Sequence, residues 1–269
     1  MDKSVTDFNV RLRTIRLREL LVGIIITLIL SGILMAIFPE IEESDELLFM
    51  VIFLIGFILF IWALRGTNGL DRNIDSLFED THKKEILFVF AINLLFAFLF
   101  TLLFSSLDIL ISLTDPTWIS MGDIETVEMD AGIIILDAID AIIFAPIMEE
   151  LIFRGVMFNR LKIRVGIIPA MIISSFIFAI GHDFGGMTSA FLFGICMCLL
   201  YLKTDNILIP MSVHFLNNVV ATVLNLTSFD VVMTQFPWII PATIISIIGT
   251  AYLITYIIQE TRKVKKQYN

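Results

Sequence analysis

The sequence predicts an all-α membrane protein, a polytopic bundle of about eight transmembrane helices, from its composition and from the lengths of its apolar runs. Of the 269 residues, 58% are hydrophobic, and the mean hydropathy is +0.93. Soluble globular domains have an apolar fraction of about 45–50%, so the composition excludes them, and it excludes disordered chains too. Without an internal repeat or a soluble domain, residues 1–269 are expected to form a single integral-membrane domain.

Eight apolar segments approach the length of about 20 residues that a membrane-spanning helix needs. The first is too long, and has too few small residues, for a cleaved signal peptide, so we expect it to be retained. Two later segments are short, and the dipeptide Gly185-Gly186 predicts a turn between them. The expected spans cover residues 19–38, 47–64, 86–107, 132–153, 167–182, 187–202, 206–226 and 238–259.

The 18 lysines and arginines fall in or beside alternate loops. The loops between carry none, and two of these, residues 39–46 and 115–130, are acidic. Because Lys and Arg accumulate in cytoplasmic loops, we expect an integral membrane protein with both termini in the cytoplasm and the lipid bilayer as its surroundings. The net charge of −9 argues against a nucleic-acid partner. The basic segments are residues 3–18, 65–84, 154–164, 203 and 262–266.

Polar residues inside the expected spans form three groups. Charged side chains are costly at the bilayer centre, so each group suggests a function. Residues four apart share a helix face, so Glu150 and Arg154 are expected to pair and to neutralise each other. Glu149 is rotated by about 100° from Glu150 and is expected to stay without that partner. The groups are Glu149, Glu150 and Arg154 in FAPIMEELIFRG; Phe178 and His182 in FAIGH; and His214 and Asn218 in HFLNN.

The three groups are expected at one depth. Glu149 lies 11 residues before Arg160, and His214 lies 11 residues after Lys203. At about 1.5 Å per residue, both are roughly 16 Å from the basic boundary. His182, counted from Pro169, is roughly 20 Å away. The carboxylate and both imidazoles therefore fall near the midplane of a hydrocarbon core of about 30 Å.

This depth shifts the expected fourth span to residues 140–160. The segment AGIIILDAID, residues 131–140, would then be interfacial or re-entrant. Asp137 and Asp140 would lie at the outer boundary, where charged groups are solvated at low cost.

These residue types could hydrolyse a peptide bond without a serine or cysteine nucleophile. Glu149, in a pocket that excludes bulk water, could act as a general base on a water that His182 also holds. His214 and Asn218 could donate hydrogen bonds to the developing oxyanion. Glu150, paired with Arg154, would keep Glu149 in position.

The same pattern resembles a known family. The order E-E-x-x-x-R, F-x-x-x-H and H-x-x-x-N on three membrane helices is similar to the CAAX protease and bacteriocin-processing family, also called Abi. The resemblance covers about residues 140–225, the expected catalytic core, and no motif position is missing. It implies an intramembrane glutamic endopeptidase that acts on a membrane-associated, CAAX-like or lipidated protein. Prokaryotic members imply peptide maturation, bacteriocin immunity or signalling as alternatives.

Three other interpretations stay open. Glu149, His182 and His214 could bind zinc, although no H-E-x-x-H helix is present and no cofactor is required by the pattern. The chain could instead be a non-catalytic membrane scaffold or immunity protein that binds a partner in the same cavity. A transporter that uses these groups as a proton relay would be expected to show broken helices in paired repeats, which the sequence lacks.

Overall fold

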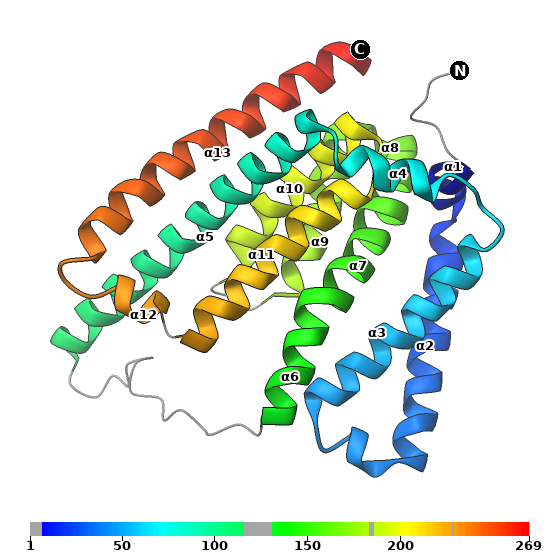
Figure 1. Cartoon of the computed structure of the whole chain (residues 1–269), viewed down its shortest axis with the longest axis horizontal. Coiled ribbons are helices and arrows are strands. Elements are labelled where there is room, and N and C mark those ends of the chain that lie inside the picture. Colours follow the sequence, from blue (N-terminus) through cyan, green and yellow to red (C-terminus); the bar gives the residue numbers. More distant parts are fainter. Residues whose placement is uncertain (1–6, 116–130, 183–185, 228, 269) are drawn as a thin grey trace.

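The computed structural model describes residues 7–115, 131–182, 186–227 and 229–268, and within these ranges the regular structure is helical throughout (Figure 1). The expected all-α fold is thus confirmed. The elements are α1 (Asp7–Thr14), α2 (Leu17–Ile37), η1 (Pro39–Ile41), α3 (Asp45–Leu64), α4 (Leu70–Leu77), α5 (Asp80–Thr114), α6 (Ala131–Ile139), η3 (Asp140–Phe144), α7 (Ala145–Glu149), η4 (Glu150–Phe158), α8 (Asn159–Val165), α9 (Ile167–Ile180), α10 (Met187–Thr204), α11 (Leu208–Thr227), α12 (Phe229–Met233) and α13 (Ile239–Tyr268).

Seven helical stretches of the described residues are long and apolar enough to cross a membrane. They correspond to seven of the eight expected spans. The remaining one, expected over residues 167–182, is α9, an apolar helix of 14 residues. At about 1.5 Å per residue, α9 is roughly 21 Å long, shorter than a hydrocarbon core of about 30 Å.

The segment at 131–140 is not re-entrant. Helix α6 runs on through η3, α7 and η4 into α8 as one helical stretch, Ala131–Val165, of 35 residues (Figure 1). The expectation of a re-entrant segment was wrong because helical geometry continues through Asp137 and Asp140 without a turn residue. Residues 116–130 of the expected acidic loop, and Gly185 of the expected turn, lie outside the described residues.

Two backbone positions with positive φ set the ends of the helices around the site. Gly166 has φ of 85° and separates α8 from α9, a conformation that glycine adopts without steric cost. Asp205 has φ of 54° and ends α10, with its N–H donating to the Tyr201 carbonyl at 2.9 Å. These two breaks turn the chain back on itself and bring α9, α10 and α11 against the helix that carries the two glutamates.

Helix α10 lies inside the bundle, and every residue from Phe193 to Tyr201 is buried. Small residues allow the close crossings: a Cβ on Gly194 would lie 2.9 Å from the Ser175 Cβ of α9. A Cβ on Gly249 of α13 would lie 2.5 Å from the Leu95 Cβ of α5. Both distances are below normal contact, so these helix pairs need glycine.

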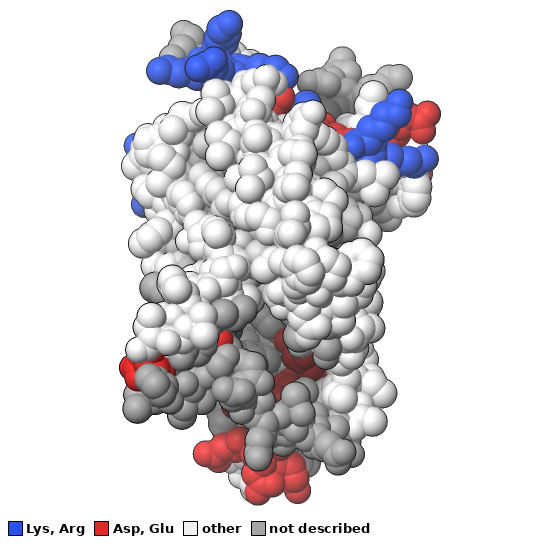
Figure 2. Space-filling view, turned by 90° about the vertical axis from the view of Figure 1, so that its left-hand side faces the viewer, with Lys and Arg blue, Asp and Glu red and all other residues white. Residues whose placement is uncertain are grey.

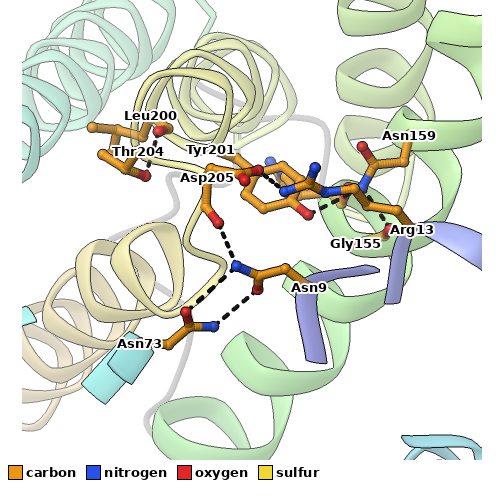
Figure 3. A network of polar contacts seen from close by, with 10 residues as sticks. Asn9, Arg13, Asn73, Gly155, Asn159, Leu200, Tyr201, Thr204 and Asp205 are labelled. Carbon is orange, nitrogen blue, oxygen red and sulfur yellow. Dashed lines mark hydrogen bonds and ion pairs between the residues drawn. The ribbon is translucent and has the colours of Figure 1, made fainter. Parts of the chain in front are cut away.

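A polar network joins α1, α4, the α8 end of the site helix and the α10–α11 turn (Figure 3). Buried Asn9 donates to the Asp205 carbonyl at 2.8 Å and exchanges hydrogen bonds with Asn73. Asn159 donates to the Gly155 carbonyl at 2.7 Å and to the Tyr201 hydroxyl at 3.1 Å. Because unpaired buried amides are costly, these contacts hold that end of the bundle together.

The molecule is charged at its ends and apolar between them. In Figure 2, lysines and arginines gather at one end, where some acidic residues lie beside them; acidic residues mark the opposite end, and the broad face between is largely uncharged. Large aliphatic side chains of α2, such as Leu21, Leu28 and Ile29, are exposed in that band, as expected for a surface that faces lipid. The described basic residues thus cluster as the sequence pattern predicted.

Candidate active site

The site helix departs from α-helical geometry on both sides of the two glutamates. The π-helical segments η3 and η4 flank the short α-helical turn α7, and Glu149 and Glu150 sit at the α7–η4 junction. A proline within a helix clashes with the carbonyl four residues earlier. The wider turn of η3 ends at Phe144, two residues before Pro146, and gives room for the proline ring. π-Helical turns are frequent at functional sites.

Glu150 is held between two partners. Its Oε1 lies 3.0 Å from Arg154 Nη1 and 3.0 Å from His214 Nδ1. The side chains of Glu150 and Arg154 are 0% and 1% exposed. The predicted Glu150–Arg154 ion pair is confirmed, and the structure adds His214 of α11 to it.

Glu149 also faces His214, a contact that the spacing along its own helix did not predict. Its Oε2 lies 3.6 Å from His214 Nε2, and its side chain is 24% exposed, against 5% for His214. The expectation considered only contacts along one helix, whereas the partner comes from α11. Glu149 is therefore the more accessible carboxylate of the pair.

The histidine tautomers follow from the acceptors that they meet. His182 Nδ1 lies 3.0 Å from the Phe178 carbonyl, which can only accept, so Nδ1 carries the proton and neutral His182 has its lone pair at Nε2. His214 Nδ1 donates to the Glu150 carboxylate in the same way. The Nε2 atom of His214 is left to face Glu149.

Phe178 is the aromatic centre of the site. The Arg154 guanidinium carbon lies 4.4 Å from its ring centroid, in a cation–π arrangement. The ring centroids of His182 and His214 lie 4.7 and 5.9 Å away. Phe178 thus covers the Arg154 guanidinium. Through its ring, the FAIGH motif contacts Arg154 of the first motif and His214 of the third.

Asn218 binds the backbone of the site helix. Its Nδ2 donates to the Ala141 carbonyl at 2.6 Å. In η3 the Ala145 N–H donates to the Asp140 carbonyl, the i→i+5 register. In that register the partner of Ala141 would be the N–H of residue 146, which is proline and has none. Pro146 therefore leaves a carbonyl unpaired, and Asn218 takes its place.

One contact of the site had no sequence signal specific enough to predict it. Phe193 of α10 packs its ring 5.0 Å from that of His214, but it is one of 24 phenylalanines in the chain. Pro146, within three residues of Glu149, was the available signal for the irregular helix. The two cysteines, Cys196 and Cys198, are both fully buried in α10.

Within the described ranges, no three His, Cys, Asp or Glu side chains are grouped to hold a metal ion. The alternative zinc set of Glu149, His182 and His214 would need a rearrangement, because His182 joins the others through Phe178. Zinc thus stays an alternative for experiment.

The similarity to known proteins lies in the region of the chain that carries the site. The sequence model of Rce1-like type II CAAX prenyl endopeptidases matches residues 131–220. YdiL of Bacillus subtilis (strain 168), named as a candidate membrane peptidase, is 33% identical over 101 residues, 34% of this chain. The membrane-embedded CAAX protease MroQ of Staphylococcus aureus (strain USA300) is 36% identical over 83 residues, 28% of this chain. Residues 131–220, which carry the site, are thus similar to CAAX proteases.

The match to this CAAX protease family covers the site and leaves most of the chain unmatched. The aligned regions span only 41% and 34% of the two relatives' own lengths. All seven motif residues, from Glu149 to Asn218, fall inside the matched residues 131–220. No solved structure matches the chain significantly.

Proposed function

We propose that this protein is an intramembrane endopeptidase that hydrolyses a peptide bond of a membrane-associated or CAAX-like protein, with a glutamate-activated water. The observation that carries the proposal is the buried chain of contacts Glu149–His214–Glu150–Arg154. The similarity of residues 131–220 to type II CAAX prenyl endopeptidases supports peptidase activity, and the contacts suggest how the side chains divide the work.

Charge balance favours one protonation state of this chain of contacts. With both glutamates ionised and Arg154 charged, the set carries one negative charge in excess. An imidazolium at His214 makes it neutral, which a site that excludes water favours. The mechanism needs an ionised Glu149 as the general base and a proton on His214 Nε2 as a donor to the oxyanion. The two requirements of the mechanism are met by the same state.

The attacking water has two acceptors available. One O–H can donate to the Glu149 carboxylate and the other to the lone pair of His182 Nε2, because His182 Nδ1 is occupied by the Phe178 carbonyl. Two fixed acceptors orient the oxygen lone pair toward a substrate carbonyl. A general base so placed contributes about 10²–10⁴ in rate.

The hydrolysis then proceeds in two proton transfers. Water oxygen attacks the scissile carbonyl carbon as Glu149 takes one proton. The oxyanion receives hydrogen bonds from His214 Nε2–H and from the second N–H of Asn218, whose first is used on Ala141. Glu149 next gives its proton to the leaving nitrogen, the C–N bond breaks as the oxyanion collapses, and the new carboxylic acid, which keeps the second water hydrogen, departs with the amine.

Orientation in the membrane follows from the basic end of the molecule. Lysines and arginines collect there (Figure 2), and such residues accumulate on the cytoplasmic side. The N-terminal helix α1 and the end of α13 lie at that same end (Figure 1). We place both in the cytoplasm of a prokaryotic cell.

Cleavage of a panel of quenched fluorescent peptides tests the proposal. The panel includes prenylated CAAX peptides and their unprenylated counterparts, and purified wild type in detergent runs beside Glu149→Gln and Glu149→Ala. Wild type is expected to cleave at least one peptide, and both variants should be slower by about 10²–10⁴. Equal rates in all three proteins would reject Glu149 as the base. A cellular phenotype that survives Glu149→Ala, with no peptide cleaved, would favour the scaffold or immunity alternative.

A further inference from the structure

A groove of about 640 Å³ opens between α2 and α3, away from the catalytic residues. Its floor is formed by Met148 and Ile152 of the site helix, and its walls by apolar residues of the two helices. The volume is within the range of about 300–1,000 Å³ typical of small-molecule sites. The catalytic mechanism above uses none of this space.

One end of the groove is cationic. Arg11 and Arg18 line it there, beside Glu19. The Glu19 carboxylate accepts a hydrogen bond from the Arg16 N–H at 2.9 Å, and Arg11, Arg16 and Arg18 all lie close to it. Three arginines thus face one carboxylate, which leaves net positive charge for an anionic ligand.

The same end lies at the level of the membrane interface. Trp62 lines the groove and is 60% exposed, and the Arg65 guanidinium carbon sits 4.5 Å from its ring centroid. Tryptophan and snorkelling arginine are typical of the headgroup region. An anion held by Arg11 and Arg18 would therefore sit at headgroup depth.

The length of the groove fits one leaflet. Along α2 the lining residues run from Arg18 to Leu28, which at about 1.5 Å per residue is roughly 15 Å. This is half of a hydrocarbon core of about 30 Å. A chain that starts at headgroup depth and ends at the midplane is an acyl chain of a single leaflet.

Glycine keeps the groove open. Gly23 lines it, and a Cβ at this position would have no heavy atom within 4 Å. A larger side chain here would fill the groove without a clash. Gly32, further along the same helix, also has open space around its Cβ position but lies outside the groove, so it offers a matched control.

We propose that this groove binds an acidic phospholipid from the leaflet at the basic end of the molecule. One acyl chain lies along Gly23 and against Met148 and Ile152, and the phosphate lies on Arg11 and Arg18. The cationic end distinguishes this ligand from a neutral phospholipid, which the apolar walls alone would accept equally well. Contact with the residues on either side of Glu149 and Glu150 gives the lipid a route to stabilise the site helix.

The test measures thermal unfolding of the purified full chain in neutral detergent, titrated with dioleoyl phosphatidylglycerol or dioleoyl phosphatidylcholine. We expect phosphatidylglycerol alone to raise the unfolding temperature of wild type. Arg18→Gln should weaken its apparent affinity about fivefold, the effect of one basic residue near an anionic lipid. Arg164→Gln, an exposed arginine outside the groove, should change it less than twofold. Gly23→Leu should abolish the stabilisation, and Gly32→Leu should keep it.

Equal stabilisation by the two lipids, or equal effects of Arg18→Gln and Arg164→Gln, would overturn the proposal. So would a Gly23→Leu variant that binds phosphatidylglycerol normally but has a raised KM for prenylated peptides, since the occupant would then be the lipid chain of the substrate. Lipid binding is measured by unfolding and does not depend on cleavage. If the protein binds phosphatidylglycerol but cleaves no peptide, the proposed peptidase function fails while the proposed lipid site stands.

Discussion

Glu149 and Glu150 are adjacent in the chain, yet their surroundings assign them different tasks. Glu150 is fully buried between Arg154 and His214, each 3.0 Å from its Oε1. Glu149 keeps 24% of its side chain exposed and has a single contact with His214 at 3.6 Å. Removing a partner from a buried ion pair leaves an uncompensated charge and costs about 3–5 kcal/mol, whereas an exposed base can be replaced at little cost.

Glu150→Gln is therefore expected to lower the free energy of unfolding by about 3–5 kcal/mol, because Arg154 loses its charged partner. Glu149→Gln should change it by less than about 1 kcal/mol while it abolishes cleavage. Denaturant unfolding in detergent measures both. The double variant Glu150→Gln/Arg154→Met, which removes both charges, should recover part of the loss. An equal loss of stability in the two single variants would contradict the division of tasks.

At this scale the sequence predicted contacts along a helix well and contacts between helices poorly. The i, i+4 spacing predicted the Glu150–Arg154 pair and the shared face of Phe178 and His182. Spacing says nothing of the angle at which α11 meets the site helix. It therefore could not predict that His214 contacts both glutamates, or that Asn218 binds the Ala141 carbonyl.

Among the elements, the irregular site helix is the least expected. Pro146 forces η3 out of α-helical register and leaves the Ala141 carbonyl without a backbone donor. Asn218 supplies that donor at 2.6 Å. The proline thus acts as a positioning residue for the asparagine of the HFLNN motif.

Pro146→Ala restores a backbone N–H that can compete with Asn218 for Ala141. We expect the rate constant kcat to fall by up to about 10², the lower bound for loss of one oxyanion donor, with KM unchanged. Stability should be equal or higher, since proline inside a helix is unfavourable. Kinetics and thermal unfolding of this variant, with Asn218→Ala as the reference for complete loss, check the prediction. A variant that is destabilised in proportion to its lost activity would show that Pro146 has only a structural role.

The crossing of α9 and α10 positions Phe178 and His182, and Gly194 makes it possible. In Gly194→Ala, the new Cβ would lie 2.9 Å from the Ser175 Cβ, so we expect a loss of about 1–3 kcal/mol of stability from overpacking. Gly32→Ala, in open space on α2, is the control and should be neutral within about 0.5 kcal/mol. The denaturant midpoints of the two variants, each compared with wild type, measure these losses of stability. Similar midpoints would mean that α9 and α10 can separate slightly without cost.

Apolar runs located the membrane helices, but their ends and continuity were harder to predict. Seven of the eight expected spans have the length to cross a membrane, and α9 is shorter. The segment at 131–140 continues as a helix into the site because no glycine or proline lies within residues 133–145. Hydropathy alone could not separate a long helix from a re-entrant segment, since both are apolar.

For the whole molecule, charge separates the two ends of an apolar bundle (Figure 2). Asn9, Arg13, Asn73 and Asp205 tie α1 and α4 to the α10–α11 turn at the basic end (Figure 3). The sequence predicted this polarity from the positions of its lysines and arginines alone, because loop charge depends on position along the chain and not on tertiary packing.

Reporter fusions at the two termini test the topology. Both the N-terminal and the C-terminal fusion should be active with a reporter that works only in the cytoplasm, and inactive with one that works only outside. A fusion within the loop at 39–46 should show the opposite pattern. Opposite results for the two termini would contradict the arrangement in which α1 and the end of α13 share one end of the bundle.

The most direct test of the account is the turnover of metal-stripped enzyme. Wild type is treated with chelator, its residual metal content is measured by elemental analysis, and kcat is compared with that of untreated enzyme and of Glu149→Gln. The account predicts that stripped wild type retains its full rate, while Glu149→Gln is slower by about 10²–10⁴ with or without metal. A rate that disappears on stripping and returns with zinc would contradict the glutamate mechanism and make Glu149 a metal ligand.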